Sequence, residues 1–243
     1  MMEEPSLEQL IHSQSEQDLR WAATSPALTE DLAVALLARR DLPGPVLQDL
    51  ARNSQVAKLR KVVVGLVSHP RTPRHVALPI IRSLYTFELM QVALAPVAPQ
   101  DIKMAVEDAL IARLETVSSG ERITLARRGS TRIAAALLGD KDPRITEAAL
   151  NNPYLTEVGV VRAVMRSDAS AQFVNAVCKH PKWWLRTEVR IALLRNVRTP
   201  GALALEIVHS LPASVAREAL MNSSLPASVK THLMGQIQQR KRD

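Results

Sequence analysis

Hydrophobic and polar positions follow a helical period along most of the chain, and one stretch of this pattern occurs twice. Residues 59 to 84 and 186 to 211 each read as an apolar helix, a Thr-Pro turn and a second apolar helix. The two stretches align without a gap and share ten of 26 positions: Val62/Val189, Leu66/Leu193, Arg71/Arg198, Thr72/Thr199, Pro73/Pro200, Ala77/Ala204, Leu78/Leu205, Ile80/Ile207, Ser83/Ser210 and Leu84/Leu211. Because a pair of short helices cannot bury its apolar face alone, this recurrence predicts stacked helical repeats.

Thr, Ser and Pro residues mark the expected helix starts. A Thr or Ser hydroxyl accepts a hydrogen bond from the first helical turn, and a Pro at the first helical position gives up an N–H that has no partner. The predicted starts are Thr29, Pro73, Thr156, Pro200 and Pro226, with further starts at Pro45, Pro99, Ser170 and Pro212. This spacing predicts short helices packed in pairs and joined by tight turns.

The segment 182–195 carries two apolar faces when drawn as one helix. Leu185, Val189, Ala192 and Leu193 form one face, and Trp184, Ile191 and Leu194 form another, roughly opposite. Two buried faces indicate a helix sandwiched between neighbours. Trp183, Arg186 and Arg190 share the remaining edge, which we expect to meet solvent or a partner.

Composition favours helices over sheets. Of the 243 residues, 47% are hydrophobic but only 3% are aromatic, and eight are glycine. Small and aliphatic side chains suit closely packed helices better than strands. We therefore predict an all-α fold, a right-handed α-solenoid of short antiparallel helix pairs. It forms one domain over residues 1–243, with a frayed head at 1–5 and a basic tail at 240–243.

Charge and cysteine content narrow the classes of partner and cofactor. The formal net charge of +7 is compatible with binding to nucleic acid, an acidic protein or anionic lipid. The basic residues are spread along the chain, however, and an Arg-rich surface that only meets solvent explains them equally well. One cysteine, Cys178, excludes an internal disulfide and a Cys-based zinc cluster. The start shows no secretory pattern and no apolar run approaches about 20 residues, so we expect a cytoplasmic monomer without membrane contact.

Three stretches resemble leucine-rich-repeat-variant and HEAT-type repeats. They read LRKVVVGLVSHPRTPRHVAL, VRIALLRNVRTPGALAL and AALNNPYLTEVGVVRAV, and the resemblance covers residues 19–238. It implies a superhelix whose concave groove binds macromolecules. Residues 85–140 carry only blurred repeats, and the cysteine cluster of some variant-repeat proteins is absent, so no iron–sulfur cofactor is expected.

Motifs for nucleotide or metal chemistry are missing from the sequence. There is no glycine-rich nucleotide loop, and no histidine pair has the spacing of a zinc hydrolase. His69 and His180 read as turn residues before Pro70 and Pro181, and Cys178 reads as structural. No cofactor is predicted.

The segment from Lys179 to Arg190 is the first candidate site. Its candidate ligand or partner face is Lys179, Lys182, Trp183, Arg186 and Arg190. Aromatic planes among basic residues can stack bases and hold phosphates, and such a groove resembles the HEAT-like-repeat DNA glycosylases. Their groove carboxylate cannot be matched here, since Asp168 and Glu188 are merely nearby. The structural alternative is that Trp184 fills the core and that Arg186 or Arg190 pairs with Glu188 or caps a neighbouring helix.

A secondary candidate anion site is Arg127, Arg128 and Arg132. Gly129 is expected to end one helix and Ser130 to cap the next. The structural alternative is an ordinary turn between helices with solvated arginines.

These observations favour a non-enzymatic helical-repeat scaffold that binds another protein. The alternative is a nucleic-acid-binding protein that uses the basic, Trp-containing face. A base-excision activity related to the glycosylases is the third possibility.

Overall fold

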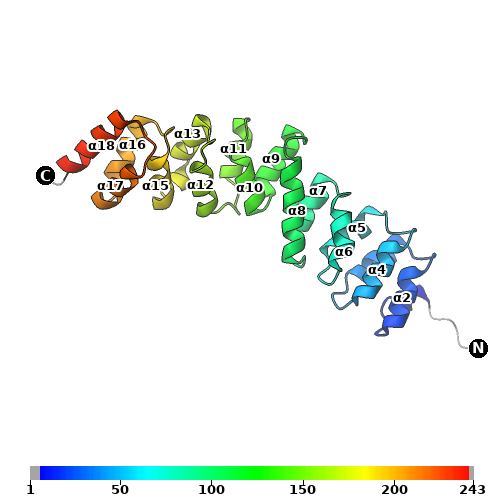
Figure 1. The fold of residues 1–243 in the computed structure, drawn as a ribbon. Helices are drawn as coiled ribbons and strands as arrows, with labels where there is room; N and C mark the ends of the chain where they lie inside the picture. The colour runs from blue at the N-terminus through cyan, green and yellow to red at the C-terminus, as the bar shows by residue number, and fades with distance from the viewer. Residues whose placement is uncertain (1–5, 241–243) are drawn as a thin grey trace, which may run out of the picture. The chain divides into compact units, whose positions relative to one another are not determined.

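The described part of the chain, residues 6–240 of a computed structural model, is all-α, as predicted (Figure 1). It contains no strand, and none of its helices is long and apolar enough to cross a membrane. The predicted head at 1–5 and residues 241–243 of the predicted tail lie outside the described residues. The helices are α1 (Leu7–Leu10), α2 (Glu16–Thr24), α3 (Glu30–Leu37), α4 (Gly44–Arg52), α5 (Arg60–Ser68), α6 (Arg74–Ile81), α7 (Thr86–Leu94), α8 (Gln100–Arg113), α9 (Ser119–Arg128), α10 (Thr131–Leu137), α11 (Pro143–Leu150), α12 (Glu157–Val164), α13 (Ala171–Lys179), α14 (Pro181–Trp184), α15 (Thr187–Arg195), α16 (Gly201–Ser210), α17 (Ala213–Met221) and α18 (Ala227–Gln239).

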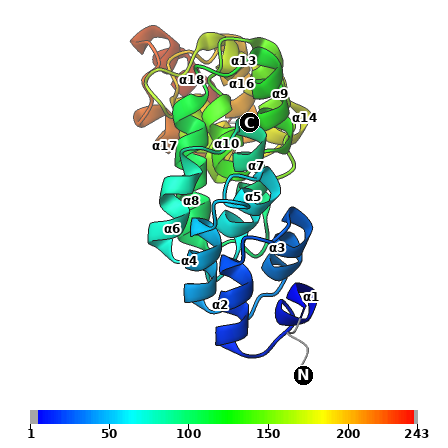
Figure 2. The same cartoon turned by 90° about the vertical axis from the view of Figure 1, so that its right-hand side faces the viewer.

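The helices fall into two compact units. Unit 1 ends at Thr116 and holds α1 to α8, and unit 2 begins at Val117 and holds α9 to α18. In unit 1, α2 packs on α4 and α6 on α8, while α3, α5 and α7 pack in a second series beside them (Figure 2). In unit 2, α9, α11 and α13 form one series and α10, α12, α15 and α17 form another. The single domain expected over 1–243 stays a prediction.

Unit 2 repeats the helix positions of unit 1. The starts of α11, α12, α13, α15, α16, α17 and α18 each lie 127 residues after the starts of α2, α3, α4, α5, α6, α7 and α8. The correspondence therefore extends well beyond the 26 residues in which the sequences match. It includes α7 and α8, where the sequence shows only a blurred pattern, because burial requires apolar residues at these positions but not particular ones.

The matched apolar positions lie in the core. Val62, Leu66, Val189 and Leu193 are all fully buried. This confirms that the repeated pattern marks the inward faces of α5 and α15.

The helix starts are at the predicted places, but the Thr-Pro turns work differently from the prediction. Pro73 and Pro200 occupy the capping position itself rather than the first helical residue. The preceding threonine then lies outside the helix that it was expected to cap. Its hydroxyl instead donates to the last turn of the previous helix, from Thr72 to the Leu66 carbonyl at 2.6 Å and from Thr199 to the Leu193 carbonyl at 2.5 Å. Each carbonyl lies in the last helical turn, where carbonyls lack the usual donor four residues ahead, and also accepts the N–H of the residue that ends the helix, His69 or Asn196.

One polar side chain at the same position in each unit ties successive helices together. His69 and Asn196 follow α5 and α15 and lie 127 residues apart. The His69 Nε2 contacts the Arg39 carbonyl at 2.7 Å, and the Asn196 amide donates to the Val164 carbonyl at 2.5 Å. Each side chain also accepts a hydrogen bond from the backbone N–H two residues ahead, of Arg71 or Arg198. Each therefore stabilises its own turn and at the same time bonds to the preceding pair of helices. The prediction that His69 is a turn residue is confirmed.

Replacing His69 with asparagine should flatten the pH dependence of unfolding. Nδ1 of His69 accepts the Arg71 N–H, so the ring is held neutral with its proton on Nε2. Burial lowers the pKa of His69, and hence the unfolded chain binds a proton at higher pH than the folded one. Stability is then lost as pH falls below the unfolded pKa near 6.5, at up to about 1.4 kcal/mol per pH unit.

The measurement is the free energy of unfolding in urea at pH 7.5, 6.5 and 5.5. In His69→Asn the new side chain has a hydrogen-bond donor and an acceptor, as Asn196 has at the matched position of unit 2, but it has no group that takes up a proton in this pH range. His209→Asn, at an exposed position of α16, is the control and should retain the full pH dependence. Equal slopes for His69→Asn and the unchanged protein would contradict this account.

Candidate functional site

Trp183 does not lie on a solvent-facing edge, contrary to the prediction. It is 1% exposed, and its indole Nε1 donates to the Leu150 carbonyl at the end of α11 at 2.8 Å. The predicted helix over 182–195 is also wrong, because the chain leaves α14 after Trp184 and begins α15 at Thr187. The break turns Trp183 inward and leaves Leu185, which was expected to be buried, 73% exposed.

Lys182 covers the one part of Trp183 that approaches the surface. Its ammonium lies 4.1 Å from the centre of the indole ring. This cation–π contact stabilises the turn and occupies the plane on which a base would stack. Trp183 is therefore part of the packing between α11 and α14 and offers no open aromatic platform.

The remaining cations of this candidate site differ in exposure. Lys179 ends α13 and Arg186 precedes α15, and both are exposed. Arg190 is half-buried and donates to the Leu185 carbonyl at 3.4 Å. Within the described residues neither Arg186 nor Arg190 forms an ion pair with Glu188, so the pairing considered from the sequence is not made.

The secondary candidate site lies where α9 meets α10. Arg127 and Arg128 are exposed at the end of α9, and Arg132 is exposed in the first turn of α10. Gly129 ends α9, as predicted. Ser130 occupies the capping position of α10, but its hydroxyl makes no capping bond and is buried without a hydrogen-bond partner among residues 6–240, so the expected cap is wrong.

Gly129→Ala should lower the free energy of unfolding by about 1–3 kcal/mol. A Cβ at this position would lie 2.5 Å from the Leu125 carbonyl oxygen and 2.7 Å from Cγ2 of Ile133, and a backbone oxygen cannot move aside cheaply. Gly120→Ala, in α9 of the same unit, is the matched control because its Cβ would meet nothing within 4 Å. We expect the control to be neutral or slightly stabilising in urea denaturation. Similar losses in both variants would disprove the steric explanation.

Hydrogen bonds bring the two candidate sites to one edge of unit 2. The Asn152 side chain, after α11, donates to the Ala126 and Gly129 carbonyls at the end of α9, at 2.7 and 3.1 Å. His180, after α13, contacts the Asn151 side chain at 3.3 Å, beside the bond from Trp183 to α11. The ends of α9, α11 and α13 are thus consecutive, and Figure 2 shows α9 and α14 on the same side of unit 2.

We call this surface the basic edge. It is defined by six of the exposed residues at these three helix ends and at the turn into α15: Arg127, Arg128, Tyr154, Lys179, Lys182 and Arg186. The exposed carboxylates of Glu147, near His180, and of Glu188, in the first turn of α15, lie beside it. None of its five cations forms an ion pair within the described residues. Arg132 lies next to it, across the turn that follows Arg128.

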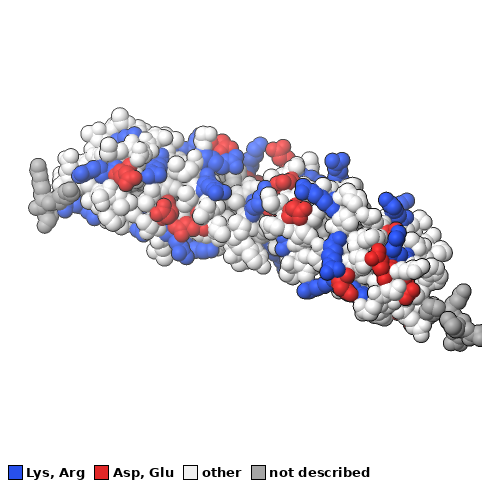
Figure 3. Space-filling view, turned by 60° about the horizontal axis from the view of Figure 1, so that its bottom comes forward, with Lys and Arg blue, Asp and Glu red and all other residues white. Residues whose placement is uncertain are grey.

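Several arginines outside the basic edge pair with nearby carboxylates. Arg166 pairs with Asp168 at 2.7 Å and Arg20 with Asp49 at 2.7 Å, and Arg60 pairs with Glu88. The bond from Arg166 lowers the pKa of Asp168, so this carboxylate is occupied and stays ionised. On the face in Figure 3, basic and acidic residues are interleaved in each unit. Exposed cations without an ion pair among the described residues also occur elsewhere, for example Arg52 and Arg198. The basic edge differs from these in that its five cations lie at consecutive helix ends of unit 2.

Cys178 and His180 do not form a reactive pair. Cys178 is buried in α13, and desolvation raises the pKa of its thiol to about 11. His180 ends the same helix and accepts the Lys182 N–H on Nδ1, which confirms its prediction as a turn residue. Among the described residues no group of three His, Cys, Asp or Glu side chains is arranged to hold a metal ion.

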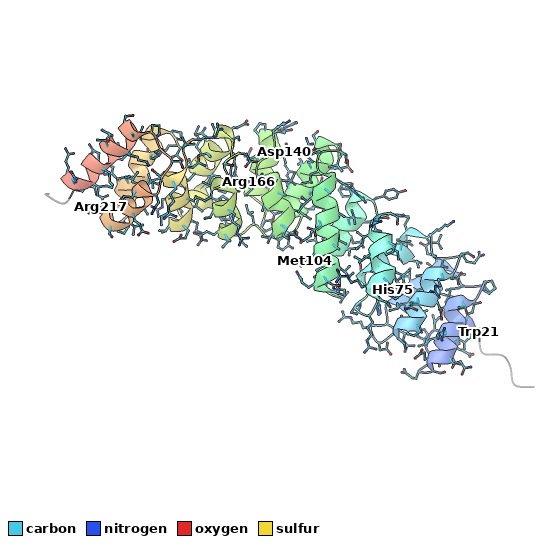
Figure 4. All side chains as sticks on the ribbon, viewed as in Figure 1. Trp21, His75, Met104, Asp140, Arg166 and Arg217 are labelled. Atoms are coloured by element: carbon cyan, nitrogen blue, oxygen red, sulfur yellow. The ribbon has the colours of Figure 1, made fainter. Side chains whose placement is uncertain are left out.

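Sequence reasoning missed two surface features. Tyr154 is 55% exposed at the basic edge, and Trp21 is 56% exposed in a shallow depression on α2 and α4 of unit 1 (Figure 4). Extending the 127-residue offset would have singled out both, since Tyr154 matches Ala27 and Trp21 matches Ala148. A large aromatic at an exposed position where the other unit has alanine is not required by the shared packing.

No model of a known protein family, no curated protein and no solved structure matches this chain.

Proposed function

We propose that the chain is a non-enzymatic scaffold that binds another protein on a right-handed α-solenoid of HEAT-like or leucine-rich-repeat-variant type. The main support is the recurrence of seven helix starts at an offset of 127 residues. Conserving this spacing while most residues change is expected of a stacked array, in which each helix pair needs only suitable apolar contacts with its neighbours. We further propose a cytoplasmic monomer without a cofactor.

The polar side chains of the repeated positions support a structural role. At matched sites, Arg113 donates to the Leu84 carbonyl and Arg240 to the Leu211 carbonyl, at 2.7 and 3.4 Å. These guanidinium groups satisfy helix ends that would otherwise lack partners. Polar side chains at matched positions thus hold successive helices together, as expected of a repeat scaffold.

The test is affinity capture with the full chain from a nuclease-treated native extract. A scaffold should retain one protein at a fixed stoichiometry, confirmed by reconstitution from the two purified chains. The control bait is a variant with three exposed cations of unit 1 replaced by glutamine, Arg52, Lys58 and Lys61, which tests for capture by charge alone. Recovery of no protein would overturn the proposal. So would loss of the captured proteins from the control bait, because capture would then depend on the charge of the bait alone.

Nucleic-acid binding is the second candidate function, and the basic edge is the observation that favours it. Five exposed, unpaired cations could neutralise phosphates and release counterions, so affinity would fall steeply with salt. Titration of labelled duplex and single-stranded DNA at 50 and 200 mM salt tests it. Absence of binding at 50 mM salt, or a flat salt dependence, would exclude this function.

A further inference from the structure

We propose that the basic edge of unit 2 binds an acidic, extended segment of the partner protein. This inference rests on the proposed scaffold function and names the surface and the chemistry of the partner. Unit 1 serves as an internal reference for the part of the edge that follows α11 and α13, because α2, α4 and α5 begin 127 residues before α11, α13 and α15. Arg127 and Arg128 of α9 have no counterpart in the described part of unit 1.

Comparison with unit 1 separates the charges that the fold needs from those that it does not. Lys179 matches Arg52, and both end a helix, where a cation offsets the negative end of the helix dipole. Lys182 and Arg186 instead match Gln55 and Leu59. The corresponding turn of unit 1 therefore forms without cations at these two positions, although it carries Lys58 and Lys61 at others, so packing does not require Lys182 and Arg186.

Tyr154 adds a fixed apolar contact to this charged surface. Its N–H donates to the Asn152 side chain at 2.7 Å, and its carbonyl accepts the Thr131 hydroxyl at 2.6 Å. The backbone is thus held on both sides while the ring remains 55% exposed. A rigid aromatic beside cations is typical of binding surfaces, where an exposed ring costs little conformational entropy to bury.

The dimensions of the basic edge suit an extended peptide. It crosses the consecutive ends of α9, α11 and α13, and packed helices lie about 8–10 Å apart. The edge therefore spans about 20 Å, which an extended segment of about six residues covers. Carboxylates along such a segment would meet Arg127 and Arg128 at one end and Lys182 and Arg186 at the other, with an apolar side chain near Tyr154.

The number of exposed aromatic rings favours an acidic peptide over single-stranded nucleic acid. Binding of single strands usually relies on several aromatic rings on which successive bases stack. Trp183 is buried under Lys182, which leaves Tyr154 as the one strongly exposed ring of the basic edge.

The experiment measures fluorescence anisotropy of three labelled probes with the full chain at 50 and 150 mM salt. The first probe is a twelve-residue peptide of Glu and Asp with one central Leu, the second is the same peptide with Gln and Asn, and the third is a twelve-nucleotide oligothymidylate. We expect the acidic peptide to bind, the neutral peptide not to bind, and the oligothymidylate to bind at least ten-fold more weakly than the acidic peptide.

Matched variants locate the binding site. Lys182→Gln with Arg186→Gln should weaken the acidic peptide at least ten-fold, and Tyr154→Ala should weaken it about three-fold. The control, Arg52→Gln with Lys58→Gln, removes the same charge from exposed positions of unit 1 and should change affinity less than two-fold. Circular dichroism and urea denaturation establish that each variant is folded.

Three results would overturn the inference. Equal weakening in both double variants would mean that net charge, and not the basic edge, binds the peptide. If the oligothymidylate bound more tightly than the acidic peptide and lost affinity in the Lys182→Gln and Arg186→Gln double variant, the basic edge would be a nucleic-acid site. Absence of acidic-peptide binding at 50 mM salt would exclude this partner chemistry, while a protein partner recovered by capture would leave the scaffold function intact.

Discussion

Replacing Trp183 with alanine is expected to lower the free energy of unfolding by about 3–5 kcal/mol. The side chain is among the largest that are fully buried, and the variant would leave a cavity between α11 and α14. It would also remove the donor to the Leu150 carbonyl, a group at the end of α11 that has no partner within that helix. Lys182 would lose the ring over which it lies.

Urea denaturation followed by circular dichroism measures this loss, and two further variants separate its causes. Trp183→Phe keeps most of the buried ring but not the donor, so it should cost clearly less than alanine. Lys182→Ala removes only the exposed cation–π contact, for which about 0.5–1 kcal/mol is expected. A loss below about 1 kcal/mol for Trp183→Ala would mean that the ring is accessible and would restore Trp183 as a ligand contact.

Leu193→Ala should cost about 2–5 kcal/mol, through lost burial and the cavity left in the core of unit 2. Leu193 is fully buried in α15, and its match in unit 1, Leu66 of α5, is equally buried. Leu66→Ala should therefore give a loss within the same range. Because contacts in a stacked array are between neighbours, the damage from each variant should be greatest in the adjoining helices.

Urea denaturation gives the size of each loss, and amide hydrogen exchange shows where it falls. We expect Leu193→Ala to lower protection in α12, α15 and α17 more than in α3 and α5, and Leu66→Ala to do the reverse. Arg186→Ala, exposed before α15, is the control and should change stability by about 1 kcal/mol or less. A large loss for Arg186→Ala would place it in a buried network between helices and remove it from the basic edge.

The sequence by itself determined the helical class, the helix starts and the inward positions of the repeated pattern. Each of these depends on local chemistry or on periodicity: a Thr or Pro sets a boundary within one turn, and the spacing of apolar residues sets the buried face. Thr29, for example, caps α3 by accepting the Leu32 N–H, as its place before an apolar pattern predicts. The buried pair Leu66 and Leu193 follows from the repeated pattern in the same way.

Only the tertiary structure decided which polar and aromatic residues reach solvent. Trp183 and Tyr154 both follow a His-Pro or Asn-Pro turn, and their neighbours in sequence do not distinguish them. The acceptor that draws Trp183 inward is the carbonyl of Leu150, 33 residues earlier, and the hydroxyl that fixes Tyr154 belongs to Thr131, 23 residues earlier. Likewise, Arg127 and Lys182 belong to one edge because Asn152 and His180 bond the preceding helix ends. Such contacts join residues whose separation in the chain exceeds any helical period, so they arise only when successive helices stack.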